Sequence, residues 1–262
     1  MKRFNQNISF LNLNMRYTRT PLILLLLSMV GLQLGIFYQN VINMSFEKNM
    51  TIDWENTTTI AWSMRFEEIL KQSYFTQIYY AIFFLTFIVI ATIPVRQSMN
   101  CKARLTLLRL PIKRTTQFGL QCVHSFFLLF MVWGTQLLVV LAAFGIYKAK
   151  VPTDLQMSNG LFLAFIRYDF LRVLYPVTNP IHFLYHLIQF IGISITAAYL
   201  GLCIRSKHSY GSSLFVIVLF MWTTNIQDVN TIFHLITTGI MCLFIFAMVK
   251  SIKPLLYIET NV

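Results

Sequence analysis

The chain has 262 residues, of which 56% are hydrophobic and 11% are charged, and its net charge is +12. Soluble domains carry about 25% charged residues, so this composition excludes an ordinary soluble domain and favours a membrane protein. A nucleic-acid partner is not expected, because the basic residues gather on one side of the predicted membrane segments and form no basic domain.

Residues 1–20 predict a helix that lies in the membrane interface, since apolar side chains recur along it at helical spacing among basic and amide residues. A disordered tail is the alternative, because chain termini often lack fixed structure. Thr20 and Pro21 suit the N-cap and first position of a new helix, which predicts a first membrane span over residues 21–42. The apolar stripe of the N-terminal segment comprises Phe4, Ile8, Leu11 and Met15.

Residues 44–73 hold five acidic residues and are predicted to form the first segment outside the cell. Their spacing predicts a short helix that rests on the outer leaflet. Its apolar face should be buried, whereas Glu67 and Lys71, spaced i and i+4 on the other face, should stay in water. The apolar face comprises Trp62, Phe66 and Ile69.

The second and third predicted spans, over residues 74–95 and 118–147, enclose a basic segment, residues 96–117. The segment holds no acid, and its first half predicts a short helix that Pro111 terminates. One interpretation is a charged loop that only fixes the membrane orientation, and the other is a docking element for a soluble partner. The basic residues are Arg96, Lys102, Arg104, Arg109, Lys113 and Arg114.

The run TLLRLPIKRTTQFGLQ in this region resembles the stretch between the second and third spans of type-2 ABC exporter permeases. In that family a leucine-rich turn, a Leu-Pro pair, a basic pair and a new span follow in that order. The chain departs from the family pattern at Lys102 and Arg104, where a Glu and a Gly are common, and at Gln121, where a Lys is common. The matching residues are Leu107, Leu108, Leu110, Pro111, Lys113 and Arg114.

The resemblance implies a coupling helix that binds a separate ABC ATPase subunit, which would hold ATP and Mg. It also implies a second permease, as a homodimer or a heterodimer, and a place in the bacterial cytoplasmic membrane. No cofactor is expected on this chain, which contains no GxxxxGK phosphate-binding loop. The expected cargo is an amphipathic peptide, such as a toxin or bacteriocin, or a hydrophobic drug. The implied ATPase-binding residues are Lys102, Leu107, Leu108, Arg109, Pro111, Lys113 and Arg114.

Residues 148–180 form the second predicted outer segment. Residues 161–175 within it are apolar but contain Arg167, Asp169 and Arg172, so an interfacial or re-entrant helix is expected there and not a span. The expected fold class is an all-α polytopic membrane protein, a single domain of six transmembrane helices. The last three spans are expected over residues 181–204, 210–226 and 231–249.

The basic residues sort by side of the membrane in this layout. The predicted inner segments hold fourteen Lys or Arg residues and one acid, whereas the outer segments hold seven Lys or Arg residues and eight acids. Cytoplasmic segments carry the basic excess, so both termini are expected in the cytoplasm. The second outer segment fits least well, with four basic residues and two acids.

Polar residues within spans mark either contacts between helices or the wall of a transport pathway, because they are costly in hydrocarbon. No metal site is expected, because His182 and His186 lie one turn apart without an identifiable third ligand, and the four cysteines form no CxxC pair. The predicted pathway residues are Gln77, Tyr80, Gln121, Ser125, Gln136, His186 and Gln189.

Two other function classes fit the composition, a membrane-embedded enzyme and a secondary carrier, either of which would act on a lipid or a hydrophobic small molecule. An enzyme would need clustered His, Asp or Glu at one depth, and the chain offers only His182 and His186. A carrier normally shows broken helices or buried charge in its spans. The exporter is therefore the expected function, with membrane lipid around the spans.

We predict that residues 100–117 face the cytoplasm and residues 44–73 face outwards, because the predicted inner segments hold the excess of Lys and Arg residues. In variants that lack the native cysteines, an impermeant thiol reagent added to intact cells should label Glu55→Cys and leave Lys102→Cys unlabelled. Labelling of position 102 with position 55 protected would reverse the topology.

Overall fold

The computed structural model describes the backbone of residues 2–50, 65–99, 114–153, 156–157, 159–177, 180–206 and 239. Helices make up the regular structure of these residues, and no strand occurs among them. The predicted coupling helix and the fifth and sixth predicted spans lie outside the described residues, apart from Gly239 in the sixth span. The side chains of some helical residues are not described, namely 2–6, 44–50, 94–99, 114, 180–182, 185–186 and 201–206.

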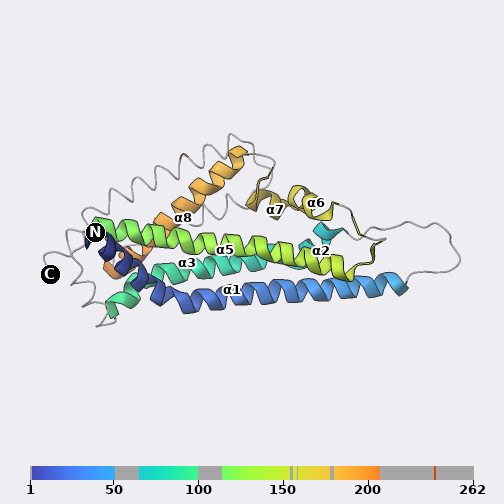
Figure 1. The fold of residues 1–262 in the computed structure, drawn as a ribbon, viewed down its shortest axis with the longest axis horizontal. Coiled ribbons are helices and arrows are strands. Elements are labelled where there is room, and N and C mark those ends of the chain that lie inside the picture. Colours follow the sequence, from blue (N-terminus) through green and yellow to red (C-terminus); the bar gives the residue numbers. More distant parts are fainter. Residues whose placement is uncertain are drawn as a thin grey trace. The chain divides into compact units, whose positions relative to one another are not determined.

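In the described part of the chain, three helices are long and apolar enough to cross a membrane (Figure 1). Two of them, with 49 and 37 residues, are longer than the ~30 Å hydrocarbon layer requires at a rise of about 1.5 Å per residue. The first three predicted spans thus lie on helices. The candidate spans are Asn7–Asn43 in α1 (Lys2–Met50), Phe75–Ile93 in α3 (Phe75–Met99) and Thr115–Lys150 in α5 (Arg114–Lys150).

The fourth predicted span corresponds to α8 (Pro180–Ser206), whose apolar stretch is the shorter Leu187–Leu200. Among the described residues, α8 is uninterrupted from Pro180, as expected for a proline at a first helical position.

The structure differs from expectation at Pro21, which lies inside α1 and not at the start of a helix. Proline removes one ladder hydrogen bond, but membrane helices tolerate it where other groups satisfy the freed carbonyl. The N-terminal segment is therefore continuous with the first candidate span. Ile8 and Met15 of the predicted apolar stripe are exposed, as a helix against lipid requires. The buried face of this segment comprises Phe10, Asn14 and Thr18.

The described residues divide into two compact units, and α1, α3 and α5 contribute to both. In the first unit, α3 contacts α8 through the rings of Phe83 and Phe190, whose centroids lie 5.9 Å apart. The second unit contains three short helices in addition to parts of the long ones. The first unit lies within Met1–Leu25, Phe83–Met131 and Leu184–Val262, and the second within Leu26–Ile82 and Val132–Phe183.

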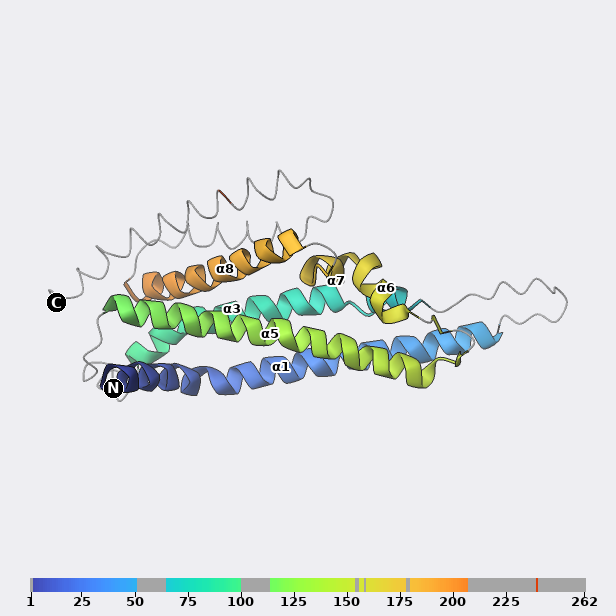
Figure 2. The same cartoon turned by 45° about the horizontal axis from the view of Figure 1, so that its top comes forward.

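The three short helices of the second unit gather beside the Lys150 end of α5 (Figures 1 and 2). We call them the short-helix layer: α2 (Phe66–Gln72), α6 (Gly160–Arg167) and α7 (Asp169–Leu174). α2 contacts α6, and α6 contacts α7. The layer therefore joins the first and second predicted outer segments, which lie far apart in the sequence.

A tight turn connects α2 to α3. Tyr74 lies in the left-handed region at φ 55°, the only non-glycine residue to do so in the described part of the chain. Such a backbone conformation costs roughly 1–2 kcal/mol. The turn is held at Ser73, whose hydroxyl donates to the carbonyl of Ile69 at 2.6 Å and accepts from the Asn40 amide at 3.0 Å.

Aromatic rings form the centre of the second unit. The fully buried ring of Phe66 lies 5.8 Å from that of Phe37, 5.3 Å from that of Phe144 and 5.4 Å from that of Tyr147. Phe37 also meets Phe75, at 6.1 Å. Each such pair contributes about 0.5–1.5 kcal/mol beyond its buried area, so these rings fix α2 against α1 and α5, and α1 against α3.

Gly160 lets α6 lie close to this aromatic centre. A Cβ at this position would lie 3.6 Å from the Cβ of Phe66 and 3.7 Å from a ring carbon of Phe144. We predict that Gly160→Ala leaves stability nearly unchanged, whereas Gly160→Leu lowers it by about 1–3 kcal/mol through overpacking. Thermal midpoints of the solubilised protein measure the difference.

Gly145→Leu is the matched control, because no atom lies within 4 Å of a Cβ at Gly145. An equal loss of stability in both leucine variants would show that close packing at Gly160 is not the cause.

Candidate functional site

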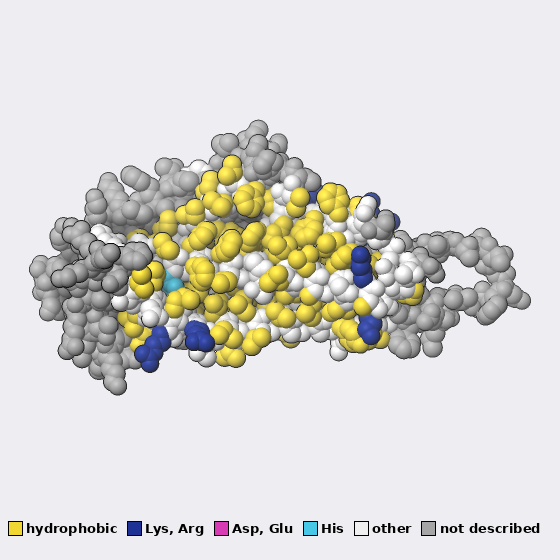
Figure 3. Space-filling model, in the orientation of Figure 1, with side chains coloured by type: hydrophobic (Ala, Val, Ile, Leu, Met, Phe, Trp, Pro, Cys, Tyr) yellow, Lys and Arg dark blue, Asp and Glu magenta, His cyan; other side chains and the backbone are white. Residues whose placement is uncertain are grey.

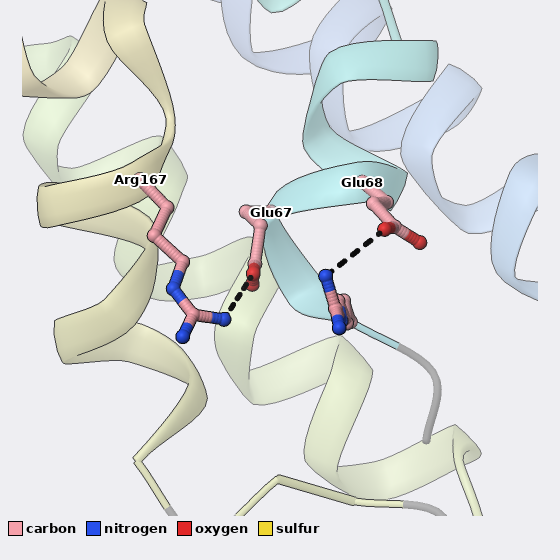
Figure 4. Close-up of polar contacts among 4 residues, drawn as sticks. Glu67, Glu68 and Arg167 are labelled. Atoms are coloured by element: carbon pink, nitrogen blue, oxygen red, sulfur yellow. Dashed lines mark ion pairs between the residues drawn. The ribbon is translucent and has the colours of Figure 1, made fainter. Parts of the chain in front are cut away.

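The short-helix layer contains a buried carboxylate. Glu67 on α2 is 8% exposed, and its Oε1 lies 3.6 Å from Nη1 of Arg167 on α6 (Figure 4). Neither oxygen of Glu67 accepts a hydrogen bond in the part of the chain that the structure describes. The guanidinium is thus the charge that offsets the cost of taking this carboxylate out of water.

The expectation that Glu67 stays in water is wrong, whereas the burial of Phe66 and Ile69 and the exposure of Lys71 are confirmed. Trp62 lies outside the described residues. Helical spacing places Glu67 away from the apolar face correctly, but α6 packs on α2 and covers Glu67 as well.

Two further ion pairs lie in the layer. Arg65 and Glu68 are 51% and 60% exposed and 3.7 Å apart, so the pair contributes only about 0–1 kcal/mol. Arg172 and Asp169 form an i, i+3 pair on α7 at 3.1 Å. The pair between Glu67 and Arg167 differs from both, because it joins two helices and one partner is buried.

Tyrosine and tryptophan side chains fix α7 to the long helices. Tyr168 shares a 2.9 Å hydrogen bond with the hydroxyl of Thr76 on α3. Trp133 Nε1 on α5 donates to the carbonyl of Leu174 at 3.1 Å, and the Tyr175 hydroxyl donates to the carbonyl of Trp133.

Two predicted pathway residues, Gln77 and Tyr80, belong to this unit. The side chain of Gln77 is exposed, and that of Tyr80 is half-buried. The Tyr80 ring lies 6.1 Å from Phe170 and 5.6 Å from Tyr79. Tyr80 is therefore part of the aromatic contact between α3 and α7.

In the first unit, buried polar side chains join α1 to α5. The Asn14 amide donates to Gln121 Oε1 at 2.7 Å, and the Thr18 hydroxyl lies 3.3 Å from His124 Nε2. The Ser125 hydroxyl donates to the backbone carbonyl of Gln121 at 2.8 Å. We call these five buried residues the polar seam.

The polar seam brings together two of the predicted pathway residues, Gln121 and Ser125. The bond between Asn14 and Gln121 corresponds to the alternative interpretation of the sequence, polar contacts between helices, whereas Ser125 bonds within α5. Asn14 and Thr18 were missed, because the N-terminal segment was expected to rest on lipid. Their spacing, two polar residues one turn apart, was the available signal.

Gln136, also on α5, belongs to the second unit. Its side chain is fully buried, and neither amide atom has a hydrogen-bond partner among the described residues. Gln189 on α8 is buried in the first unit, and the side chain of His186 is not described. The predicted pathway residues thus divide between the two units.

The predicted ATPase-binding residues lie outside the described residues, except Arg114, whose backbone begins α5. Within the described part of the chain, no group of three or more His, Cys, Asp or Glu side chains is placed to hold a metal ion.

No protein-family model, curated protein or solved structure matches the chain. The functional interpretation therefore depends on the residues of the chain itself. The described helices support a helical membrane protein.

We predict that the pair between Glu67 and Arg167 responds asymmetrically to substitution. Arg167→Ala should lower the free energy of unfolding by about 2–4 kcal/mol, because it leaves a buried carboxylate without its counter-charge. Glu67→Gln should cost about 1 kcal/mol or less, since the Arg167 side chain is 49% exposed and can reach water or headgroups. The double variant should therefore be more stable than Arg167→Ala alone.

Unfolding by SDS in mixed micelles measures these differences. Arg65→Ala is the control, because its partner Glu68 is exposed and loses little when the pair is broken. Equal effects of Arg65→Ala and Arg167→Ala would contradict the role assigned to the buried carboxylate.

Proposed function

We propose that the chain is the membrane-spanning permease subunit of an ATP-driven ABC exporter. The observation that carries the proposal is the place of the Leu-Pro and basic residues. They lie in residues 100–113, which connect the Met99 end of one candidate span, α3, to the Arg114 start of another, α5. Type-2 exporter permeases have their coupling helix at the corresponding place.

The arrangement of α5 suits a coupling role. The helix begins at Arg114, the last basic residue of the basic segment, so a displacement of residues 100–113 is expected to act on α5. The polar seam then joins the first turns of α5 to Asn14 and Thr18 of α1. In the proposed mechanism, closure of the ATPase subunits moves residues 100–113, and α5 and the N-terminal part of α1 move with them.

The proposed cargo is an amphipathic peptide or a hydrophobic drug. In its support, the candidate spans are rich in aromatic residues and nearly free of ionisable ones, so they lack the carboxylates that a proton- or sodium-coupled carrier needs. ATP and Mg belong to the partner ATPase, since the sequence has no phosphate-binding loop. A second permease, of the same or another sequence, completes the pathway.

We predict that Leu107 and Leu108 are the apolar anchors of ATPase binding. Losing one well-buried leucine from a docking surface costs on the order of 1–3 kcal/mol, and a charge in its place costs more. Leu108→Asp should therefore release the ATPase or uncouple hydrolysis from transport, with membrane insertion unchanged. Co-purification of the ATPase encoded beside this chain, together with substrate-stimulated hydrolysis, provides the measurement.

Lys102→Ala is the control for this experiment, because an exposed charge contributes less than about 1 kcal/mol at physiological salt. If Leu107 and Leu108 can both become Asp with ATPase binding and stimulation unchanged, the segment only orients the chain in the membrane and the exporter proposal fails.

A further inference from the structure

Helix α6 buries its small residues and leaves a large apolar side chain exposed. From Gly160 to Ile166 it contains no polar side chain. Its small residues Gly160 and Ala164 are buried, whereas Phe162 is 57% exposed. A helix on a wet surface would turn its large apolar side chains inwards and expose polar ones. The outer face of α6 therefore fits an apolar environment.

The contacts of α6 and α7 with α5 give their position along that helix. Gly160 lies against the ring of Phe144, and the carbonyl of Leu174 accepts the hydrogen bond from Trp133. The 11 positions from Trp133 to Phe144 correspond to about 16 Å of helix. Both residues lie inside the candidate span Thr115–Lys150, which carries no charge before Lys148. The two short helices thus run beside a stretch of α5 that is suited to hydrocarbon.

The exposed surface of α5 between Trp133 and Phe144 is also apolar. Leu138 is 65% exposed, and Leu141 is exposed as well. Figure 3 shows the exposed side chains of one face of the molecule as mainly hydrophobic, with only a few Lys and Arg side chains. Phe162 is therefore one of several large apolar side chains that the second unit exposes.

The charged side chains of α6 and α7 are paired in a way that also suits an apolar environment. Arg167 pairs with Glu67 at 3.6 Å, and Arg172 pairs with Asp169 at 3.1 Å. Charged groups at membrane depth are expensive unless they pair or reach the interface. Every charged residue of α6 and α7 has an opposite charge within ion-pair distance.

We propose that α6 and α7 form a re-entrant element embedded in one leaflet of the membrane, with Phe162 in contact with lipid acyl chains. The distribution of Lys and Arg residues predicts that this is the outer leaflet. The two ion pairs neutralise the charges that enter the leaflet with these helices. The partner of this surface is lipid hydrocarbon. The inference does not depend on the exporter function.

Nitroxide labels at single cysteines test the proposal in proteoliposomes, in a variant without the native cysteines. The label at Phe162→Cys should collide with oxygen, which partitions into hydrocarbon, several-fold more effectively than with a water-soluble nickel chelate. Leu138→Cys should give the same ratio, because it lies exposed on the candidate span itself. Lys71→Cys, exposed on α2, should give the opposite ratio.

A nickel accessibility at position 162 equal to that at position 71 would place α6 in water and overturn the proposal. Low accessibility to both reagents would mean that protein covers the helix, which also overturns it. Should Phe162→Cys fail to fold, Ile166→Cys supplies the measurement, since it lies one turn further along the same face of α6.

Discussion

A charged or polar group that leaves water needs a partner, and this constraint acts on both units of the chain. In the second unit the Glu67 carboxylate is buried against Arg167, which ties two segments that are distant in sequence. In the first unit, amide, hydroxyl and imidazole groups of α1 and α5 lie within hydrogen-bond distance of one another. The apolar helices supply the area to bury, and these polar contacts decide which faces meet.

Packing follows from the same contacts. Gly160 packs against Phe66 and Phe144, on the same helix, α6, that carries Arg167 to Glu67. The carboxylate beneath α6 is largely removed from water, which increases its dependence on the guanidinium. A small residue, an aromatic cluster and an ion pair therefore act as one arrangement in the short-helix layer.

Helix α5 links the two proposals. It begins at Arg114, the last basic residue of the basic segment, carries Gln121 and His124 of the polar seam, and supports α6 and α7 further along through Trp133 and Phe144. In the proposed exporter, a helix with such contacts suits the transmission of a movement of the basic segment. Gln136 is buried on this helix without a hydrogen-bond partner among the described residues, and Gln121 Nε2 is a second buried group on it that is still to be satisfied.

The sequence by itself determined the all-helical class, the positions of the first three candidate spans and the burial of Phe66 and Ile69, because apolar runs and helical spacing are local properties. Only the tertiary structure decided that Glu67 is buried, since spacing assigns a face to a helix but not the segment that covers it. The burial of Asn14 likewise depends on Gln121 of α5, a contact partner far along the chain. At Pro21 the helix continues although the local sequence favours the start of a new one, because membrane helices tolerate proline where other groups satisfy the freed carbonyl.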